Sequence, residues 1–433
     1  MNKKGGSMKP EEILFCRLMS MALHPEEISA FTEEDLVFLE KEADAIFTLA
    51  KRHSMQLALY DSVCMLQVPL SPSLNAVMQK MVLSCCLQSY QMLSFTRRVL
   101  SVLQQEGIHY ILLKGVSLLA CYPKLEFRGY GDVDILVSDA EEFKRAKKRF
   151  LAEGFFTKKD YADHQLELIY IDGGVRYLLE LHSKVIGSQD DKHLNQKTEV
   201  LFSDLQGISA YLPEAGLHYT AFPETENTLY LLLHMLQHFL NSGFGVKLLC
   251  DWVVYIEANA GKIDWDYYQE LVSDMGLAGF SHAMAALCIR YFGLPADSIP
   301  LLEQYTPSDG ALEELMIDIM NAGEFGKTDT SRMLIMAKGR KPYHYLLQFH
   351  RQMKNRFPNA HKLVLLWPVL WVVTGICFLW NNYTLRGTST REVLAMTRKR
   401  QHLLRELKLF EKGSGEPSGQ DGLSAAGRKG QVR

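Results

Sequence analysis

The sequence predicts an α+β protein in which a small α/β unit is embedded in a mainly helical chain. Residues 10–105 carry apolar side chains at helical spacing. Residues 108–182 instead combine short apolar runs with the turn sequence D-G-G at 172–174, which is typical of a β-hairpin. After Pro223 the helical spacing returns. The α/β unit is therefore expected to lie between two helical regions.

The first helical region carries boundary signals at both ends of its helices. Thr32 is followed three residues later by Asp35, a spacing that resembles a helix capping signal. A long amphipathic stretch over 75–105 ends just before Gly107, and glycine is common immediately beyond a helix C-terminus. Both signals predict helices.

The α/β unit alternates strands and helices. Residues 109–114 and 132–137 are expected to form strands, with one or two helical turns over 116–122 between them. A helix is expected over 139–154, and residues 164–182 are expected to form the hairpin.

Five segments are expected along the chain. They are a helical region at 8–105, an α/β core at 106–215, a second helical region at 216–345, a basic C-terminal region at 346–411 and a disordered tail at 412–433. The tail is predicted from its Gly, Ser, Pro and charged residues.

Composition excludes a disordered chain, because 47% of the 433 residues are hydrophobic and can form a sizeable core. The eight cysteines include no C-x-x-C pair, so reduced thiols in a cytoplasmic protein are expected. No apolar segment follows the basic residues at the N-terminus, so no secretory signal is predicted.

Two carboxylates mark the strand at 132–137. Asp132 and Asp134 are two residues apart, so in a strand they project from the same face. Their mutual repulsion is relieved by a divalent cation, and carboxylate oxygens suit Mg²⁺. The alternative is a pair of solvated acids at an exposed strand end.

The neighbouring residues favour the metal site. Lys114 and Gly115 occupy an expected strand-to-helix turn, where backbone N–H groups can face an anion. Arg128 offers a donor fork suited to phosphate. Glu180 lies on a later strand and shares its face with His182. These groups suggest metal-assisted phosphoryl or nucleotidyl transfer.

The pattern resembles the polymerase-β-type nucleotidyltransferase superfamily, which carries a glycine turn, an Asp-x-Asp pair and a third acid on a later strand. It is most similar to an uncharacterised bacterial nucleotidyltransferase group with an L-K-G … R-x-x-x-D-x-D pattern, here at 113–134. The E-L-H at 180–182 matches the place where that group carries an acid followed by Leu-His. The resemblance covers most of residues 10–360.

The resemblance implies a small polymerase-β-like core and a Mg²⁺- or Mn²⁺-dependent enzyme. Such an enzyme transfers a nucleoside monophosphate from an NTP to a hydroxyl or amine acceptor and releases pyrophosphate. Asp132 and Asp134 would bind the metal. Glu180 would complete the metal site or activate the acceptor. The acceptor class stays open among a small molecule, an envelope sugar and a protein.

The phosphates would be held by Lys114, Gly115 and Arg128 if the resemblance holds. From the residues alone, Lys114 can equally be a strand-end residue with a buried stem. Arg128 can equally form a structural pair with Asp132. A second function class therefore remains, a catalytically inactive nucleotide- or partner-binding protein that keeps the fold.

Three further residues are accessory candidates. His234 and His238 are four residues apart on an apolar helix, where they can be packing residues, acceptor or phosphate contacts, or metal ligands. Asp251 lies in the apolar run L-L-C-D-W. Its expected partner is Lys247, four residues earlier, and a lid role over the nucleotide is the alternative.

The charge of the chain is concentrated near its C-terminus. Residues 338–408 hold 14 Lys and Arg against 2 acids, a net charge of +12, which leaves −15 for the rest of a chain whose total is −3. This region contains an uncharged run at 363–380. It is expected to bind an anionic membrane surface, to dock on the acidic remainder of the chain, or to hold an anionic substrate. No specific nucleic acid is expected.

Overall fold

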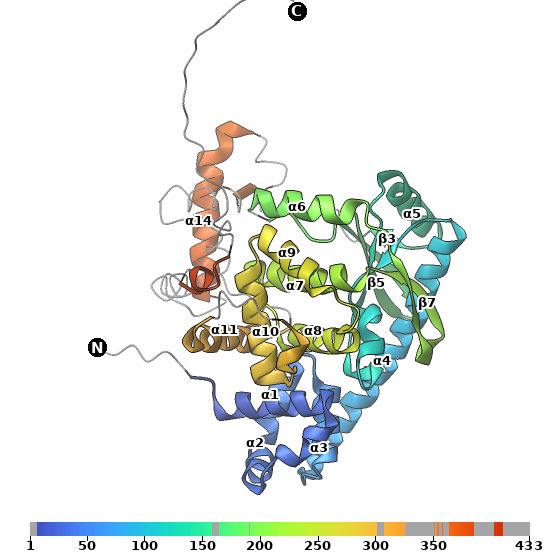
Figure 1. Ribbon diagram of the computed structural model, residues 1–433. Coiled ribbons are helices and arrows are strands. Elements are labelled where there is room, and N and C mark those ends of the chain that lie inside the picture. Colours follow the sequence, from blue (N-terminus) through green and yellow to red (C-terminus); the bar gives the residue numbers. More distant parts are fainter. Residues whose placement is uncertain are drawn as a thin grey trace, which may run out of the picture.

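The computed structural model describes residues 7–157, 164–189, 191–300, 307–324, 350, 353–354, 357, 363–384 and 402–409, and within these the side chains of 378–384 are excepted. The protein is α+β, as predicted, with a small mixed sheet against a helical body (Figure 1).

Four α-helices form the first helical region. They are α1 (Pro10–Leu23), α2 (Glu33–Arg52), α3 (Gln56–Met65) and α4 (Pro72–Gln105). At the start of α2, Thr32 accepts a hydrogen bond from the Asp35 backbone and the Asp35 carboxylate accepts one from the Thr32 backbone. Gly107 lies beyond the end of α4 with a φ of 60°, a conformation that favours glycine. Both predicted boundary signals are confirmed.

The sheet has five strands in the order β1-β2-β5-β4-β3. They are β1 (Ile111–Leu112), β2 (Asp132–Leu136), β3 (Phe156–Thr157), β4 (Gln165–Asp172) and β5 (Val175–His182). β2 and β5 are parallel, whereas the other neighbouring pairs are antiparallel. The predicted hairpin at 164–182 is confirmed as β4 and β5, joined through Gly173 and Gly174.

Short helical segments connect these strands. Between β1 and β2 lie the 3₁₀ helices η2 (Gly115–Cys121) and η3 (Leu125–Phe127). Helix α5 (Ala140–Ala152) follows β2, and its N-cap is Asp139, whose carboxylate accepts hydrogen bonds from the Glu141 and Glu142 backbones.

After β5 come α6 (Lys192–Ser203) and a separate hairpin of β6 (Ile208–Leu212) and β7 (Leu217–Ala221), with the 3₁₀ turn η4 (Pro213–Ala215) between its strands. The expected segment boundary at 215 falls within this hairpin.

Helices resume at α7 (Glu224–Asn241), as predicted. They continue through α8 (Val246–Asn259), α9 (Trp265–Asp274), α10 (Ala278–Phe292), the 3₁₀ turn η5 (Ala296–Ser298) and α11 (Asp309–Ala322). The buried residues of these helices belong to the same apolar core as those of α1, α2 and α3. The two helical regions are therefore one packed body, and the α/β unit is inserted into it.

Helix α4 links the two apolar cores of the molecule. Leu74 and Met78 near its start belong to the helical core, whereas Val99 and Leu100 near its end pack with the sheet. A 34-residue helix thus fixes the α/β unit relative to the helical body. This matters for the site, which lies between the sheet and helices α7 and α8.

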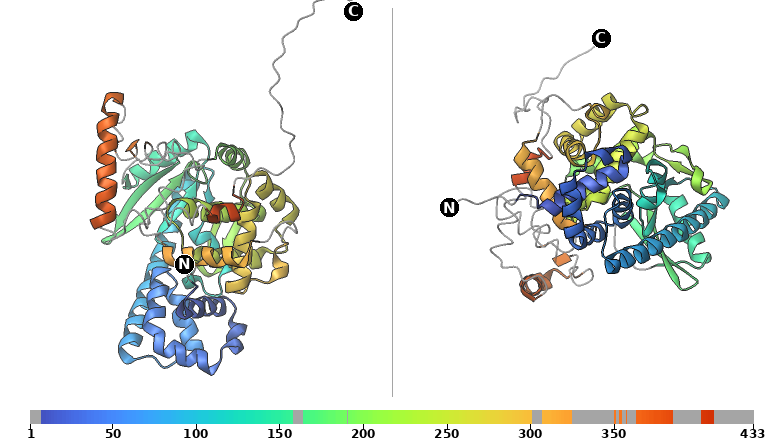
Figure 2. Two further views of the ribbon diagram at one scale, coloured as in Figure 1. Left: turned by 90° about the vertical axis from the view of Figure 1, so that its left-hand side faces the viewer. Right: turned by 90° about the horizontal axis from the view of Figure 1, so that it is seen from below.

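The uncharged run forms a short turn, η7 (Val364–Leu366), and helix α14 (Trp367–Thr384). Figure 2 shows α14 as a rod beside the rest of the molecule. Several of its apolar side chains are exposed, and Leu365 in the preceding turn is 94% exposed. Among the described residues, no helix has the length and apolar character needed to cross a membrane. About half of the basic region at 346–411 and the whole expected tail at 412–433 lie outside the described residues.

Candidate functional site

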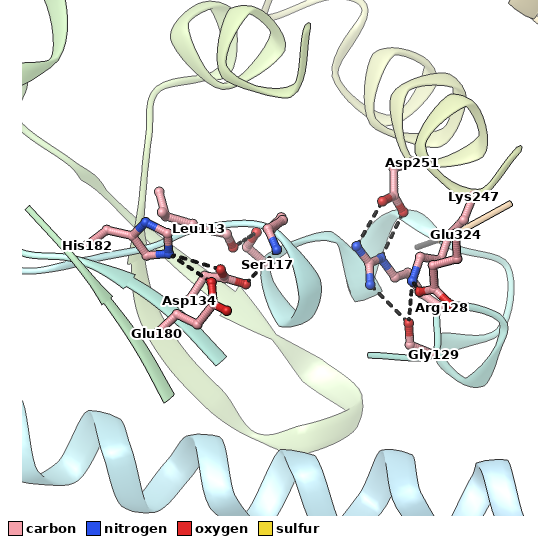
Figure 3. Close-up of polar contacts among 11 residues, drawn as sticks. Leu113, Ser117, Arg128, Gly129, Asp134, Glu180, His182, Lys247, Asp251 and Glu324 are labelled. Carbon is pink, nitrogen blue, oxygen red and sulfur yellow. Dashed lines mark hydrogen bonds and ion pairs between the residues drawn. The ribbon is translucent and has the colours of Figure 1, made fainter. Parts of the chain in front are cut away.

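The parallel pairing of β2 with β5 brings three of the predicted site residues together. Asp134 is opposite Glu180, and Leu136 is opposite His182. Residues two apart on a strand share a face, so Asp134, Glu180 and His182 all project from the same face of the sheet. The side chain of His182 leans toward the two carboxylates (Figure 3).

Direct contacts connect these side chains. His182 Nε2 lies 3.1 Å from Asp134 Oδ1 and 3.5 Å from Glu180 Oε2. Lys114 Nζ lies 3.1 Å from Asp134 Oδ2. Asp134 is almost completely buried, with 1% of its side chain exposed. A carboxylate at this depth therefore has two cationic neighbours, as buried charges require.

The protonation states follow from burial and these neighbours. Burial opposes ionisation of Asp134, but Lys114 and His182 overcome it and hold the pKa of Asp134 well below its usual range. Burial favours neutral His182, whereas its hydrogen bonds to Asp134 and Glu180 raise its pKa to about 9. Burial raises the pKa of Glu180, and Asp134 and Asp132 add to this effect while His182 and Lys114 oppose it. Near neutral pH His182 is thus a cation between two acids.

The donor set fits a divalent cation. One ligand atom each from Asp134, Glu180 and His182 lies within 4.8 Å of the other two. Nδ1 of His182 is buried without a hydrogen-bond partner among the described residues. Two carboxylates suit Mg²⁺ or Mn²⁺, and an imidazole adds a nitrogen ligand. A cation here would replace the charge that His182 supplies. Asp132, the other predicted ligand, shares the face of Asp134 but is not one of these three residues.

The predicted glycine turn lies beside this cluster. Lys114 is the N-cap residue of η2, and Gly115 is its first residue. Gly115 has a φ of 79°, which favours glycine. A β-carbon at this position would find its nearest heavy atoms only at 4.0 Å, so the requirement for glycine is conformational rather than steric. Both residues line the same cavity as the acids.

Arg128 and Asp251 have partners that differ from those we predicted. Arg128 Nε and Nη2 each donate to one oxygen of Asp251, both at 2.9 Å, and Nη1 donates to Gly129 O at 3.0 Å. The Tyr122 hydroxyl donates to the same carboxylate at 2.7 Å. The fork expected to hold phosphate, or to pair with Asp132, is therefore engaged by Asp251. The expected pairing of Asp251 with Lys247 is wrong, since Lys247 pairs with Glu324.

His234 and His238 lie on α7 and line the cavity. Their rings meet edge to face, with centroids 4.5 Å apart. Burial lowers the pKa of His238 to about 4, and nearby Lys114 contributes to this shift. Burial also holds the pKa of His234 well below its usual range, with His238 adding to the effect. Both histidines are therefore neutral near pH 7, and they can accept or donate hydrogen bonds without adding charge.

One cavity of about 600 Å³ is lined by the acidic cluster, the glycine turn, Arg128 and both histidines, whereas Asp251 is not part of its lining. Its lining also includes residues that we did not predict, namely Tyr130, His164, Gln165, Glu167, Tyr230, Gln237, Lys247 and Glu324. Glu167 was detectable from sequence. The D-G-G turn fixes the hairpin register, and that register places Glu167 opposite Glu180. Tyr230 and Gln237 lie on α7, and their approach to the sheet depends on helix packing that no local pattern predicts.

Comparison with protein families gives one match. A family model described as "Uncharacterised nucleotidyltransferase" matches residues 40–293, which is more than half of the chain. Comparisons with curated proteins and with solved structures give no match. The matched range extends from α2 to the end of α10 and thus includes the cavity residues from the sheet, α7 and α8.

Proposed function

The chain belongs to this uncharacterised nucleotidyltransferase family, and on that premise we propose that it transfers a nucleoside monophosphate from an NTP to a hydroxyl or amine acceptor. The cofactor would be Mg²⁺ or Mn²⁺. The observation that carries the proposal is the convergence of Asp134, Glu180 and His182 within 4.8 Å. They converge beside a glycine turn and a lysine in a cavity large enough for a nucleotide.

The acidic residues would hold the cation. Asp134 and Glu180 supply oxygen ligands from neighbouring strands, with His182 beside them. Asp132 lies two residues before Asp134 on β2, where it can bind the cation directly or through water. When bound, the cation supplies charge neutralisation for the phosphates and for the leaving pyrophosphate. Glu180 is the member best placed to take the proton of an acceptor, because burial and its acidic neighbours raise its pKa.

The phosphates would lie on the Lys114 side of the cavity. The ammonium group of Lys114 can exchange its contact with Asp134 for one with a phosphate oxygen while its stem stays buried. The backbone at Gly115 and the neutral rings of His234 and His238 add polar groups without further charge. We assign Arg128 the role of a positioning residue, which ties η3 to α8 through Asp251.

The direct test is incubation of the full-length protein with each α-labelled NTP, Mg²⁺ or Mn²⁺, and a fractionated small-molecule and protein extract. We expect label in a product that forms only with the metal and not with Asp134→Asn protein. Label that never leaves the NTP, together with unaltered melting temperature in Mg·NTP, would favour the alternative of an inactive partner-binding protein.

We also propose that the C-terminal region binds an anionic membrane surface. Supporting this are the net charge of +12 over 338–408 and the exposed side chains of Leu365, Val369 and Val372. Flotation with vesicles containing phosphatidylserine should recover the protein at low salt and less of it at high salt. Removal of residues 338–433 should abolish the binding. Protein that stays unbound at low salt would instead indicate docking on the acidic remainder of the chain or on an anionic substrate.

A further inference from the structure

A second cavity lies immediately beside the acidic cluster and has no role in the function proposed above. Its volume is about 430 Å³, within the range of small-molecule sites. It lies where β2 and β5 end and is lined by residues of α5 and α6, which both lie near the upper end of the sheet in Figure 1. Val185 lines both this cavity and the one that holds the acidic cluster.

The strand register places the second cavity at the ends of β2 and β5, just beyond the acidic cluster. Leu136, in the second cavity, is two residues beyond Asp134 on β2, a separation of roughly 7 Å along the strand. Ser183, also in the second cavity, directly follows His182 on β5. A compound in the second cavity therefore needs to extend only a few bonds to reach Glu180.

The walls of the second cavity are mainly apolar. The apolar side chains are Leu136, Ala140, Phe143, Val185, Ile186 and Phe202. Its charged groups are already matched, since Lys184 pairs with Glu199 at 3.0 Å and Lys144 pairs with Glu141 at 2.7 Å. A phosphate group here would have to displace one of these carboxylates from its lysine. The cavity therefore suits an uncharged body rather than a nucleotide.

One polar group in the lining lacks a partner. Thr198 on α6 is 95% buried, since its exposed fraction is 5%, and its Oγ1 has no hydrogen-bond partner among the described residues. By contrast, Asn195 one turn earlier is satisfied, because its amide exchanges hydrogen bonds with the Gln189 backbone at 2.8 and 2.7 Å. A buried hydroxyl without a partner is costly. Because Oγ1 itself has almost no accessible surface, a compound in the cavity does not reach it, and Thr198 contributes to the wall through its other atoms.

We propose that this second cavity binds the acceptor, and that the acceptor is a neutral compound with an apolar body and a hydroxyl group that reaches Glu180. The inference rests on the proposed function. In the transfer, the acceptor oxygen forms a bond to the α-phosphorus and its proton passes to Glu180. The bond from the α-phosphorus to the bridging oxygen breaks, and pyrophosphate leaves with the bonding electrons.

The test uses 2-phenylethanol as the probe, with glycerol as a polar alcohol for comparison. Saturation-transfer NMR on full-length protein, without nucleotide, measures binding of the probe. Ser203→Trp places an indole at the mouth of the cavity and should weaken binding at least about tenfold, the scale of a lost apolar contact surface. Val200→Trp is the matched control, because Val200 is on the same helix, is 71% exposed and lies outside the cavity lining. It should change binding less than about twofold.

Thr198→Val provides a second variant that keeps the cavity shape. It should change probe binding less than about twofold, because Oγ1 is closed to the cavity, and it should not lower the melting temperature. No detectable binding of 2-phenylethanol to the unaltered protein, or equal effects of Ser203→Trp and Val200→Trp, would overturn the cavity assignment.

The acceptor role is tested separately with α-labelled NTP and Mg²⁺. We expect label on 2-phenylethanol in excess of glycerol, and we expect Ser203→Trp to reduce this transfer while leaving Mg·NTP affinity unchanged. Loss of Mg·NTP affinity in Ser203→Trp protein would overturn the proposal, because the cavity would then belong to the nucleotide. Failure of the unaltered protein to bind any Mg·NTP would instead refute the proposed function, whatever the probe binding shows.

Discussion

Two buried charge clusters lie at the candidate site, and they use their hydrogen-bonding groups in opposite ways (Figure 3). In the first, Arg128 and Asp251 form two parallel hydrogen bonds, and Tyr122 and the Gly129 carbonyl engage further groups. Charge is balanced one to one. Such a cluster fastens η3 to α8 and has little capacity left for a ligand.

The second cluster is unbalanced. Three carboxylates, those of Asp132, Asp134 and Glu180, face two cations, Lys114 and His182. His182 is shared between two acids and keeps a buried nitrogen without a partner among the described residues. The difference teaches that burial of charge alone does not identify a functional site. A surplus of one sign beside a cavity is the stronger indication, because a ligand of opposite sign can complete it.

The largest expected effect comes from breaking the unbalanced cluster at its centre. Asp134→Asn should lower metal-dependent nucleotide transfer by about 10⁴-fold, roughly 5 kcal/mol of activation free energy. The measurement is turnover of α-labelled NTP by folded protein. Turnover within about tenfold of the unaltered enzyme would remove Asp134 from the metal site.

The same substitution also tests the sign of the local electrostatics. Repulsion between Asp132 and Asp134 alone predicts that removing a charge raises the melting temperature. The ion pairs of Asp134 with Lys114 and His182 predict the reverse. We therefore expect Asp134→Asn to melt lower and Asp132→Asn, at the more exposed residue, to melt close to the unaltered protein.

Breaking the balanced cluster should reduce stability instead of specifically reducing catalysis. Asp251→Ala leaves the Arg128 guanidinium buried and uncompensated, which should lower the free energy of unfolding by about 4 kcal/mol. Urea denaturation measures this loss. The matched control, Arg128→Met with Asp251→Leu, removes both charges and should recover most of the stability. If the double variant is as unstable as Asp251→Ala, the loss does not come from the unpaired charge.

These two clusters also mark how far sequence reasoning extends. The strand period put Asp132 and Asp134 on one strand face and Glu180 with His182 on one face of a later strand, and the glycine turn was visible at Gly115. The Arg128–Asp251 pair joins residues 123 positions apart. Local spacing favoured Lys247 as the partner of Asp251, because an i, i+4 pair on one helix is the nearest choice. Tertiary packing of η3 against α8 decided otherwise.

The helical body was predictable for a different reason. Capping residues such as Thr32 and apolar spacing define each helix locally. The short β6–β7 hairpin was not predicted, since its strands expose polar and apolar residues without a clear period. Cavity residues on α7, such as Tyr230 and Gln237, could not be assigned either. Their place in the site depends on how the helical body packs on the sheet.

A smaller effect is expected at the edge of the unbalanced cluster. Glu180→Gln keeps the shape of the side chain but cannot accept the acceptor proton as a carboxylate does. Turnover should fall about 100-fold, while NTP affinity changes less than about threefold. Single-turnover kinetics and equilibrium binding of Mg·NTP separate the two quantities. An equal loss of affinity and turnover would show that Glu180 binds the ground-state metal–nucleotide complex instead.

The smallest expected effect concerns His53, whose pKa shows how burial acts on a histidine that has no acidic partner among the described residues. His53, in the helical body, accepts a hydrogen bond from the Val246 backbone at Nδ1 and stacks on Phe15. Burial lowers the pKa of His53 to about 4, with Arg52 contributing, whereas partners raise the pKa of His182. As pH falls below about 6.5, the His53 imidazole takes up a proton in the unfolded chain, whereas in the folded protein it stays neutral until about pH 4. Stability should therefore decline through this window.

This contribution amounts to about 2 kcal/mol at pH 5. His53→Asn tests it, because Asn can still accept the Val246 hydrogen bond at a similar position but does not titrate. Urea denaturation at pH 7 and pH 5 should show a smaller pH-dependent loss for the variant than for the unaltered protein. Equal losses would mean that other groups govern acid stability and that burial of His53 without a charged partner adds little. A smaller loss would establish that burial, with a lesser contribution from Arg52, lowers the pKa of a histidine in this fold. The upward shift at His182 would then be attributable to the acids of the unbalanced cluster.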